Sequence, residues 1–296
     1  MKQLYTARRR SMSALSTMSV MPVIFTMLLA GCGGEAHSQA APAVTATTSL
    51  TVPDGYTLVW SDEFAVNGLP DTTKWTYDTG MNKQGWHNHE LQYYSRARAD
   101  NSQIRDGKLL ITARKEALSG EADWGGQNYT SARLTTQGKQ DWTYGYFEIR
   151  AKLPCGKGSW PAIWMLGSKG DWPAMGELDI MEQIGKEPAN VFSTIHTTAG
   201  SGANGTGANT QIPDACTAFH TYQMLWTGEQ ISFGVDGKIH LVYANPHTGL
   251  ARWPFDAPQF LILNIAIGGD LGGAVDDSVF PIQMEIDYVR VYQKPK

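Results

Sequence analysis

The chain has 296 residues, of which 42% are hydrophobic and 18% are charged, and its net charge is −4 at neutral pH. This composition is that of a globular protein and excludes extensive disorder. Binding to nucleic acid or to an anionic membrane needs concentrated lysine and arginine, so we expect no nucleic-acid partner and favour a neutral substrate. The chain contains ten tryptophans and twelve tyrosines, and indole rings can bind a sugar by stacking on its apolar face. Most aromatic side chains, however, belong to a protein's core.

The first 31 residues have the pattern of an export signal. Lys2 and Arg8–Arg10 form a basic end, and the apolar run from Val20 to Ala30 is too short to span a membrane comfortably. Leu29-Ala30-Gly31-Cys32 resembles the bacterial lipobox, in which the cysteine is acylated and becomes the first residue of the mature protein. The alternative is an ordinary signal peptide with a chance cysteine.

Gly33 follows Cys32 at the place where an aspartate would favour retention in the inner membrane. We therefore expect an exported protein that is lipid-anchored in the outer membrane, faces the periplasm or the cell surface, and touches the membrane only through its anchor. Residues 32–52 are rich in Gly, Ala, Ser and Thr, a composition typical of a flexible tether.

Residues 53–294 have the pattern of one folded domain made of β-strands. Apolar residues alternate with polar ones over 109–113, 147–151, 231–235 and 284–288, which predicts strands with one solvent-exposed face. Asp236-Gly237 supplies the positive φ angles of a tight hairpin turn.

The nearly unbroken apolar run from Phe260 to Ile267, which contains Asn264, predicts a strand that is covered on both sides, although periodicity alone leaves a buried helix open. No long amphipathic helix pattern is present. The fold class is therefore all-β, an antiparallel β-sandwich whose concave face would form a substrate groove.

Cys155 and Cys216 would mature in an oxidising compartment, where two remaining thiols are more often paired than free. We predict a disulfide between them. Two separately buried thiols are the alternative, because the sequence cannot show that the two Cα atoms lie within reach.

Three carboxylates lie in the segment 176–182, Gly-Glu-Leu-Asp-Ile-Met-Glu. In a strand Glu177 and Asp179 share a face, but Glu182, five positions from Glu177, would point into the core, where an unpaired carboxylate is costly. A β-bulge at Ile180-Met181 would absorb one residue and place all three acids on one surface. The bulge is therefore predicted.

Two carboxyl groups on one curved surface are what a retaining glycosidase needs. We assign Glu177 as the nucleophile and Glu182 as the acid/base. Asp179 lies between them and would hold the nucleophile in place and raise the proton affinity of the acid by like-charge repulsion. On spacing alone, a solvated acidic face is the more common interpretation.

The segment Glu-Leu-Asp-Ile-Met-Glu resembles the catalytic signature of glycoside hydrolase family 16, in the bulged form of the laminarinase-like endo-β-1,3-glucanases. Further segments similar to that family occur in the same order along residues 53–293: Trp60–Phe64, Glu90–Tyr94, Tyr129–Arg133, Gly158–Met165 and Asp287–Tyr292. The resemblance implies a concanavalin-like jelly roll.

The resemblance also implies substrate-binding residues, namely Trp86, Asn88, Arg133, Trp160, Trp164 and His196. Either Trp160 or Trp164 could instead belong to the core, and His196 could be a structural histidine. His87 and His89 depart from the family pattern, which weakens the assignment of a sugar subsite there. A structural Ca²⁺ is common in the family, and Glu63, Gly107 and Asp287 match its ligand positions.

The sequence thus predicts retaining endo-hydrolysis of β-1,3-glucan of the laminarin type, with mixed β-1,3-1,4-glucan as a second substrate and no cofactor for the chemistry. Galactan hydrolysis and transglycosylation are the nearest alternatives. A non-catalytic carbohydrate-binding surface module is the alternative from another class. We expect the protein to be a monomer.

Overall fold

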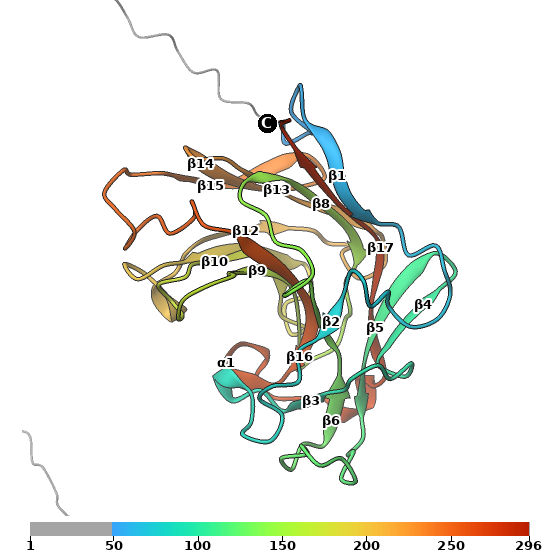
Figure 1. The fold of residues 1–296 in the computed structure, drawn as a ribbon. Coiled ribbons are helices and arrows are strands. Elements are labelled where there is room, and N and C mark those ends of the chain that lie inside the picture. The colour runs from blue at the N-terminus through green and yellow to red at the C-terminus, as the bar shows by residue number, and fades with distance from the viewer. Residues whose placement is uncertain (1–48, 296) are drawn as a thin grey trace, which may run out of the picture. The chain divides into compact units, whose positions relative to one another are not determined.

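Two β-sheets packed face to face make up the described part of the chain, residues 49–295, in this computed structural model (Figure 1). These residues belong to one compact unit. The lipobox cysteine and the export signal lie outside the described residues.

The larger sheet contains ten strands, of which eight follow one another in space: β15 (Lys238–Ala244), β14 (Gln230–Val235), β13 (His220–Trp226), β8 (Gly145–Lys152), β17 (Ile282–Gln293), β5 (Lys108–Lys115), β6 (Tyr129–Ser131) and β3 (Gln92–Tyr94). In addition, β1 (Thr57–Asp62) pairs with β17, and β4 (Ser102–Arg105) pairs with β5. All pairs are antiparallel except β3 with β6, which is parallel.

The smaller sheet is antiparallel throughout and carries the acidic segment. Its seven strands lie in the order β12 (Thr206–Gln211), β11 (Asn190–His196), β10 (Glu177–Gln183), β9 (Ser159–Gly167), β16 (Gln259–Ile267), β7 (Arg133–Thr135) and β2 (Thr76–Tyr77). The predicted fold class, an all-β antiparallel sandwich, is confirmed.

The core lies between the two sheets and is built from the alternating apolar residues of both. Phe147 and Phe233 of the larger sheet and Ile163 and Leu178 of the smaller sheet belong to one buried cluster. Every residue of β16 is buried, as the unbroken apolar run predicted, because β16 lies between β9 and β7 and is covered on both faces.

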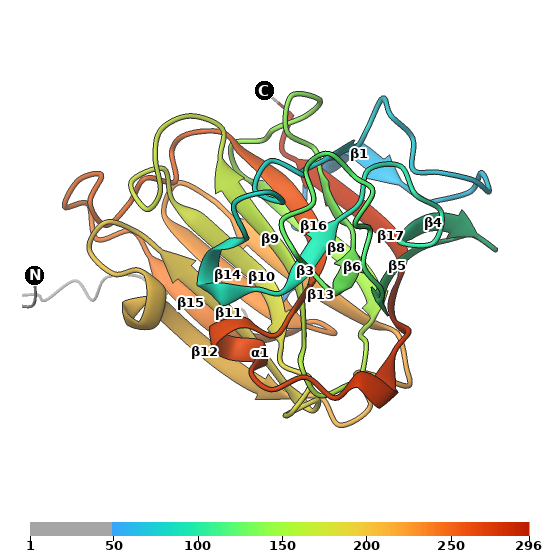
Figure 2. The same cartoon turned by 90° about the horizontal axis from the view of Figure 1, so that it is seen from below.

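Helices are short and lie in the connections: η1 (His87–His89), η2 (Gly202–Asn204), α1 (Gly269–Gly272) and η3 (Asp277–Val279). The helix α1 lies against η1 and contacts β9 and β16 of the smaller sheet (Figure 2). His89 Nδ1 lies 2.8 Å from Asp270 Oδ1, which connects η1 to α1. Over residues 49–295 no helix is long and apolar enough to cross a membrane.

The turn between β14 and β15 has the predicted hairpin geometry, with φ values of 49° at Asp236 and 77° at Gly237. This turn also binds the end of the predicted tether. Leu50 is 2% exposed, and its backbone N–H donates to the carbonyl of Gly237 at 2.7 Å. The folded part therefore begins earlier than residue 53, because a single apolar side chain in a polar segment finds a place in the core.

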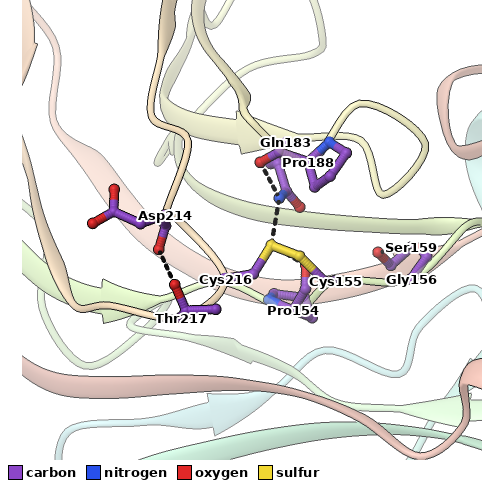
Figure 3. Close-up of a disulfide and its surroundings, with 9 residues drawn as sticks. All are labelled: Pro154, Cys155, Gly156, Ser159, Gln183, Pro188, Asp214, Cys216 and Thr217. Atoms are coloured by element: carbon purple, nitrogen blue, oxygen red, sulfur yellow. Dashed lines mark hydrogen bonds between the residues drawn. A yellow bond between two sulfur atoms is a disulfide. The ribbon is translucent and has the colours of Figure 1, made fainter.

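The predicted disulfide between Cys155 and Cys216 is confirmed, with Cα atoms 5.6 Å apart (Figure 3). It connects the segment between β8 and β9 to the segment before β13. Gln183, the last residue of β10, donates through Nε2 to the carbonyl of Pro188 at 2.8 Å and to the sulfur of Cys216 at 3.6 Å. The disulfide therefore lies against the end of the strand that carries the three acids.

Candidate active site

The predicted bulge in β10 is confirmed by the register of its two neighbours. Against β11, Asp179 lies opposite Thr194 and Glu182 lies opposite Phe192, so three steps along β10 match two steps along β11. Against β9, the shift falls between Asp179 and Met181. Ile180 is thus the extra residue. Because the bulge absorbs it, the side chain of Glu182 points to the same face as those of Glu177 and Asp179.

All three acids consequently lie on the face of the smaller sheet that points away from the core. Leu178 and Met181, which alternate with them, belong to the core cluster. Glu177 is half-buried, whereas Asp179 and Glu182 are buried.

Indole N–H groups hold two of the carboxylates. Trp160 Nε1 donates to Glu182 Oε1 at 2.8 Å. Trp172, which lies in the connection between β9 and β10 and is 50% exposed, donates through its indole nitrogen to Glu177 Oε2. These contacts fix the direction of each acid from a neighbouring segment.

Burial and, to a smaller extent, the charge of Glu177 raise the pKa of Glu182 to about 7, whereas the Trp160 hydrogen bond opposes the shift. Burial also raises the pKa of Asp179 well above its usual range, and the charges of Glu177 and Glu182 and a hydrogen bond to Glu177 act in the same direction. Burial and the neighbouring charges therefore favour the protonated form of Asp179.

The predicted effect of Asp179 on the proton affinity of Glu182 stays a prediction. The charges of Glu177 and Glu90 raise the pKa of Glu182. Asp179 also contacts the nucleophile candidate, because its protonated form donates a hydrogen bond to Glu177.

His196 ends β11 directly opposite Glu177. Its Nε2 lies 3.1 Å from Asp179 Oδ2, and its ring centroid lies 6.2 Å from that of Trp172. Burial lowers the pKa of His196, so the ring is neutral at pH 7. Gly205 makes room for the ring, because a Cβ there would lie 2.8 Å from it. The structure therefore places His196 among the acids, as the resemblance implied.

Trp160 and Trp164 both belong to β9 and lie four residues apart, so they share one face of the strand. Trp164 pairs in register with Asp179, and Trp160 reaches Glu182. Trp160 is 9% exposed and Trp164 is half-buried. Both tryptophans therefore lie on the side of the smaller sheet that carries the acids.

The guanidinium of Arg133 lies between two indoles. Its Cζ is 4.7 Å from the ring centroid of Trp164 and 5.0 Å from that of Trp86, and its Nε is 3.0 Å from Asp78 Oδ2. Such stacking restrains both tryptophans. Trp86, Arg133 and Trp164, which are separated by 78 residues from first to last, are therefore brought together as predicted.

Asn88 lies at the margin of this region. It is exposed, has a φ of 57°, and its Nδ2 lies 3.5 Å from Glu90 Oε1. His87 and His89, the two departures from the family pattern, are both exposed in η1.

Sequence reasoning missed three residues of this site: Trp172, Asn264 and Glu90. Asn264 on β16 accepts from Trp164 Nε1 at 2.7 Å and donates to Tyr94 Oη at 3.0 Å. The pKa of Glu90 is raised by burial, and its charge acts on Glu182. A polar residue inside an otherwise apolar strand was the available signal for Asn264, and no local pattern identifies Trp172.

The proposed calcium ligands are not assembled. Glu63 accepts from Arg290 Nε and Nη2 at 2.9 and 2.8 Å, and Asp287 lies 2.5 Å from Arg150 Nη1. Each carboxylate faces a cation, so Glu63, Gly107 and Asp287 as they lie do not fit a Ca²⁺ ion. Within residues 49–295, the cluster of His and acidic groups whose atoms all lie within 4.8 Å of one another is Glu177, Asp179 and His196.

Two hollows of the described surface lie away from the acids. One of about 410 Å³ is lined by Glu187–Asn190 with Asn209 and Gln211, and one of about 450 Å³ is lined by residues around Ser61–Val66 and Lys74. The predicted groove over Glu177 and Glu182 stays a prediction.

Comparison with known proteins agrees with this geometry. The chain matches the family described as "Glycosyl hydrolases family 16" over residues 89–290. It is 48% identical over 250 residues to a protein named beta-glucanase from Rhodothermus marinus, with 80% of this chain and 85% of that protein covered.

Two solved structures are similar over most of the chain. SCLam, a non-specific endo-β-1,3(4)-glucanase, is 51% identical with a TM-score of 0.81, and the match covers 83% of this chain and 94% of that one. The laminarinase from Rhodothermus marinus is 47% identical with a TM-score of 0.76, and 81% and 98% are covered. The fold, the bulged acidic strand and these matches together show that the chain belongs to glycoside hydrolase family 16.

Proposed function

We propose that this protein is an endo-acting hydrolase of β-1,3-glucan that retains the anomeric configuration. The observation that carries the proposal is the bulge of β10, which places the half-buried Glu177 and the buried Glu182 on one face. The raised pKa of Glu182, about 7, lets this carboxyl group hold a proton near neutral pH. One nucleophile and one acid/base on a common surface are what a double displacement requires.

In the first step, a carboxylate oxygen of Glu177 attacks the anomeric carbon and the bond to the glycosidic oxygen breaks. Glu182 gives its proton to that oxygen, so the leaving sugar departs as an alcohol. The hydrogen bonds that Glu177 accepts from Trp172 and Asp179 aim the nucleophile and spread its charge.

In the second step, Glu182 is a carboxylate and takes a proton from water. The hydroxide equivalent attacks the anomeric carbon, the ester bond to Glu177 breaks, and both carboxyl groups return to their initial states. Both steps use only carboxyl groups and water, so the chemistry needs no cofactor.

The substrate class rests on the relatives together with the aromatic side chains beside the acids. SCLam is named an endo-β-1,3(4)-glucanase and its Rhodothermus counterpart a laminarinase. Trp160, Trp164 and Trp172 surround the carboxylates in this chain, and indoles can stack on glucose rings. We therefore propose laminarin-type glucan as the substrate and mixed β-1,3-1,4-glucan as a second one.

The test is release of reducing sugar from laminarin by wild type, Glu177→Gln and Glu182→Gln. We expect wild type to release short oligosaccharides and both variants to lose at least about 10³-fold in kcat, because each substitution removes one of the two chemical groups. Azide should restore turnover in Glu177→Ala, since a small anion replaces the missing nucleophile.

Product analysis on laminarin, lichenan, agarose and carrageenan separates the alternatives. Turnover of agarose or carrageenan in place of laminarin would show a galactan hydrolase. Products with longer sugar chains than the substrate would show a transglycosylase. Binding of laminarin without product from wild type would identify a carbohydrate-binding module and refute the proposal.

A further inference from the structure

A chain of hydrogen bonds connects the two sheets directly beneath the bulge. Ser193 Oγ lies 2.8 Å from the carbonyl oxygen of Ile180, and His240 Nε2 lies 2.9 Å from the same hydroxyl. Ile180 belongs to β10, Ser193 to β11 and His240 to β15, which is part of the larger sheet.

Ser193 lies at the one place where the ladder around β10 is interrupted. Ile180 pairs in register with no residue of β9 or β11, and its carbonyl accepts a hydrogen bond from the Ser193 hydroxyl. Ser193 lies between Thr194 and Phe192, opposite the two residues of the bulge, and its side chain is fully buried. Its hydroxyl therefore supplies the hydrogen bond that the bulge removes.

His240 is itself an extra residue. Leu241 pairs with Phe233 and Ile239 pairs with Gly234, so His240 between them has no partner in β14. This second bulge directs the imidazole toward the smaller sheet, and in this way the two bulges are joined through a single hydroxyl.

The direction of the two hydrogen bonds follows from the donors that are present. A carbonyl can only accept, so the Ser193 hydroxyl donates its one proton to Ile180. The bond between Ser193 and His240 must then come from Nε2–H, and Nδ1, which is buried without a partner, carries no proton. Burial lowers the pKa of His240 to about 4, which keeps the ring in this neutral state.

We propose that Ser193 and His240 are positioning residues that hold the bulge of β10 and thereby aim Glu182 at the leaving oxygen. Neither residue touches substrate, because both lie on the core side of the smaller sheet. The inference rests on the proposed function, since the role of Glu182 as acid is part of it.

The experiment measures kcat, KM and the pH profile of kcat on laminarin for Ser193→Ala, His240→Leu and His240→Gln. Ser193→Ala leaves the Ile180 carbonyl unpaired, and we expect kcat to fall on the order of tenfold or more with KM changed less than about twofold. A relaxed bulge exposes Glu182 to water and lowers its pKa. The alkaline limb of the pH profile, where kcat falls as Glu182 loses its proton, should therefore move to lower pH. His240→Leu should act in the same direction. His240→Gln should restore kcat, because its amide can donate where Nε2–H does.

Ser232→Ala is the matched control. Ser232 is about as buried as Ser193 and lies within a sheet, but it belongs to β14, and its hydroxyl accepts a hydrogen bond from Gln230 Nε2 at 3.2 Å. Near-ultraviolet circular dichroism checks that each variant is folded. Equal kcat and equal pH profiles in folded Ser193→Ala and Ser232→Ala would overturn the proposal. If Ser193→Ala does not fold, equal kcat values for His240→Leu and His240→Gln would overturn it.

Hydrogen exchange separates this inference from the proposed function. Amides of residues 177–183 should exchange at least about tenfold faster in Ser193→Ala than in Ser232→Ala, whether or not the wild type cleaves laminarin. Unchanged exchange would refute the anchoring of the bulge. A wild type that cleaves no glucan would refute the proposed function alone.

Discussion

The proton on Glu182 is the most consequential single-residue feature of the site. Burial and the charge of Glu177 raise its pKa to about 7, and the Trp160 indole limits the rise because it donates to the ionised form. Glu182 therefore carries a proton below pH 7 and loses it above, which sets the pH range in which the first step can proceed.

The kcat/KM of the wild type on laminarin should fall as pH rises through about 7, since this ratio reports the free enzyme. Trp160→Phe removes the hydrogen bond that favours the carboxylate, so the pKa of Glu182 should rise and the alkaline limb should move to higher pH. The measurement is the pH dependence of initial rates for both proteins.

Trp164→Phe is the control for this prediction. This substitution removes an indole from the same strand, but the Trp164 indole donates its hydrogen bond to Asn264 and not to Glu182. We expect a raised KM and an unmoved alkaline limb. An equal shift in the two variants would contradict the assignment of that limb to Glu182.

Among the elements, those whose cause is local could be predicted from the sequence. The bulge followed from parity, because Glu182 would otherwise be buried in the core, and the turn at Asp236-Gly237 followed from the φ angles it needs. The bulge at His240 and the contact of Trp172 with Glu177 have no local cause. They depend on a partner strand or loop far away in the chain, and so the sequence alone could not show them.

The calcium prediction is not confirmed, and the reason again lies in distant parts of the chain. Glu63 and Asp287 are acidic residues at family-like positions, but Arg290 and Arg150 from neighbouring positions in the larger sheet pair with them. Which cation neutralises a surface carboxylate depends on strand register, and register is a property of the assembled sheet.

The disulfide gives a prediction at the scale of connected elements. Replacing both Cys155 and Cys216 by serine opens a covalent link between residues 61 positions apart. The free energy of unfolding should fall by about 2 to 4 kcal/mol, because the unfolded chain gains conformational freedom. Guanidinium unfolding measures this loss.

Catalysis should survive that double substitution at temperatures where the protein remains folded. Cys216 contacts Gln183 at the end of β10 and not the acids themselves. We therefore expect kcat within about twofold of wild type. An unchanged midpoint and slope of unfolding would contradict a stabilising disulfide.

At the scale of the whole molecule, the described domain accounts for the chemistry, and the first 48 residues would account for its place in the cell. We propose that the chain is exported and anchored by a lipid on Cys32, on the basis of the basic end, the apolar run and the lipobox-like residues in that order.

Cys32→Ala should abolish labelling of the protein by radioactive palmitate in the bacterial host, because the acylated side chain is missing. The double serine variant at positions 155 and 216 should be labelled like wild type, since its lipobox is intact. Undiminished labelling of Cys32→Ala would refute the anchor.

The position of β17 within the larger sheet has a consequence for how the molecule assembles. Although β17 is the last of the described strands, it lies in the interior of that sheet, between β8 and β5, and also pairs with β1, more than 200 residues earlier in the chain. Until residues 282–293 are available, β1, β5 and β8 each lack the neighbour that satisfies one side of their backbone. The barrier to folding is therefore the entropy of closing a loop nearly as long as the domain, and refolding belongs to the slow regime of milliseconds to seconds that non-local β-topologies share.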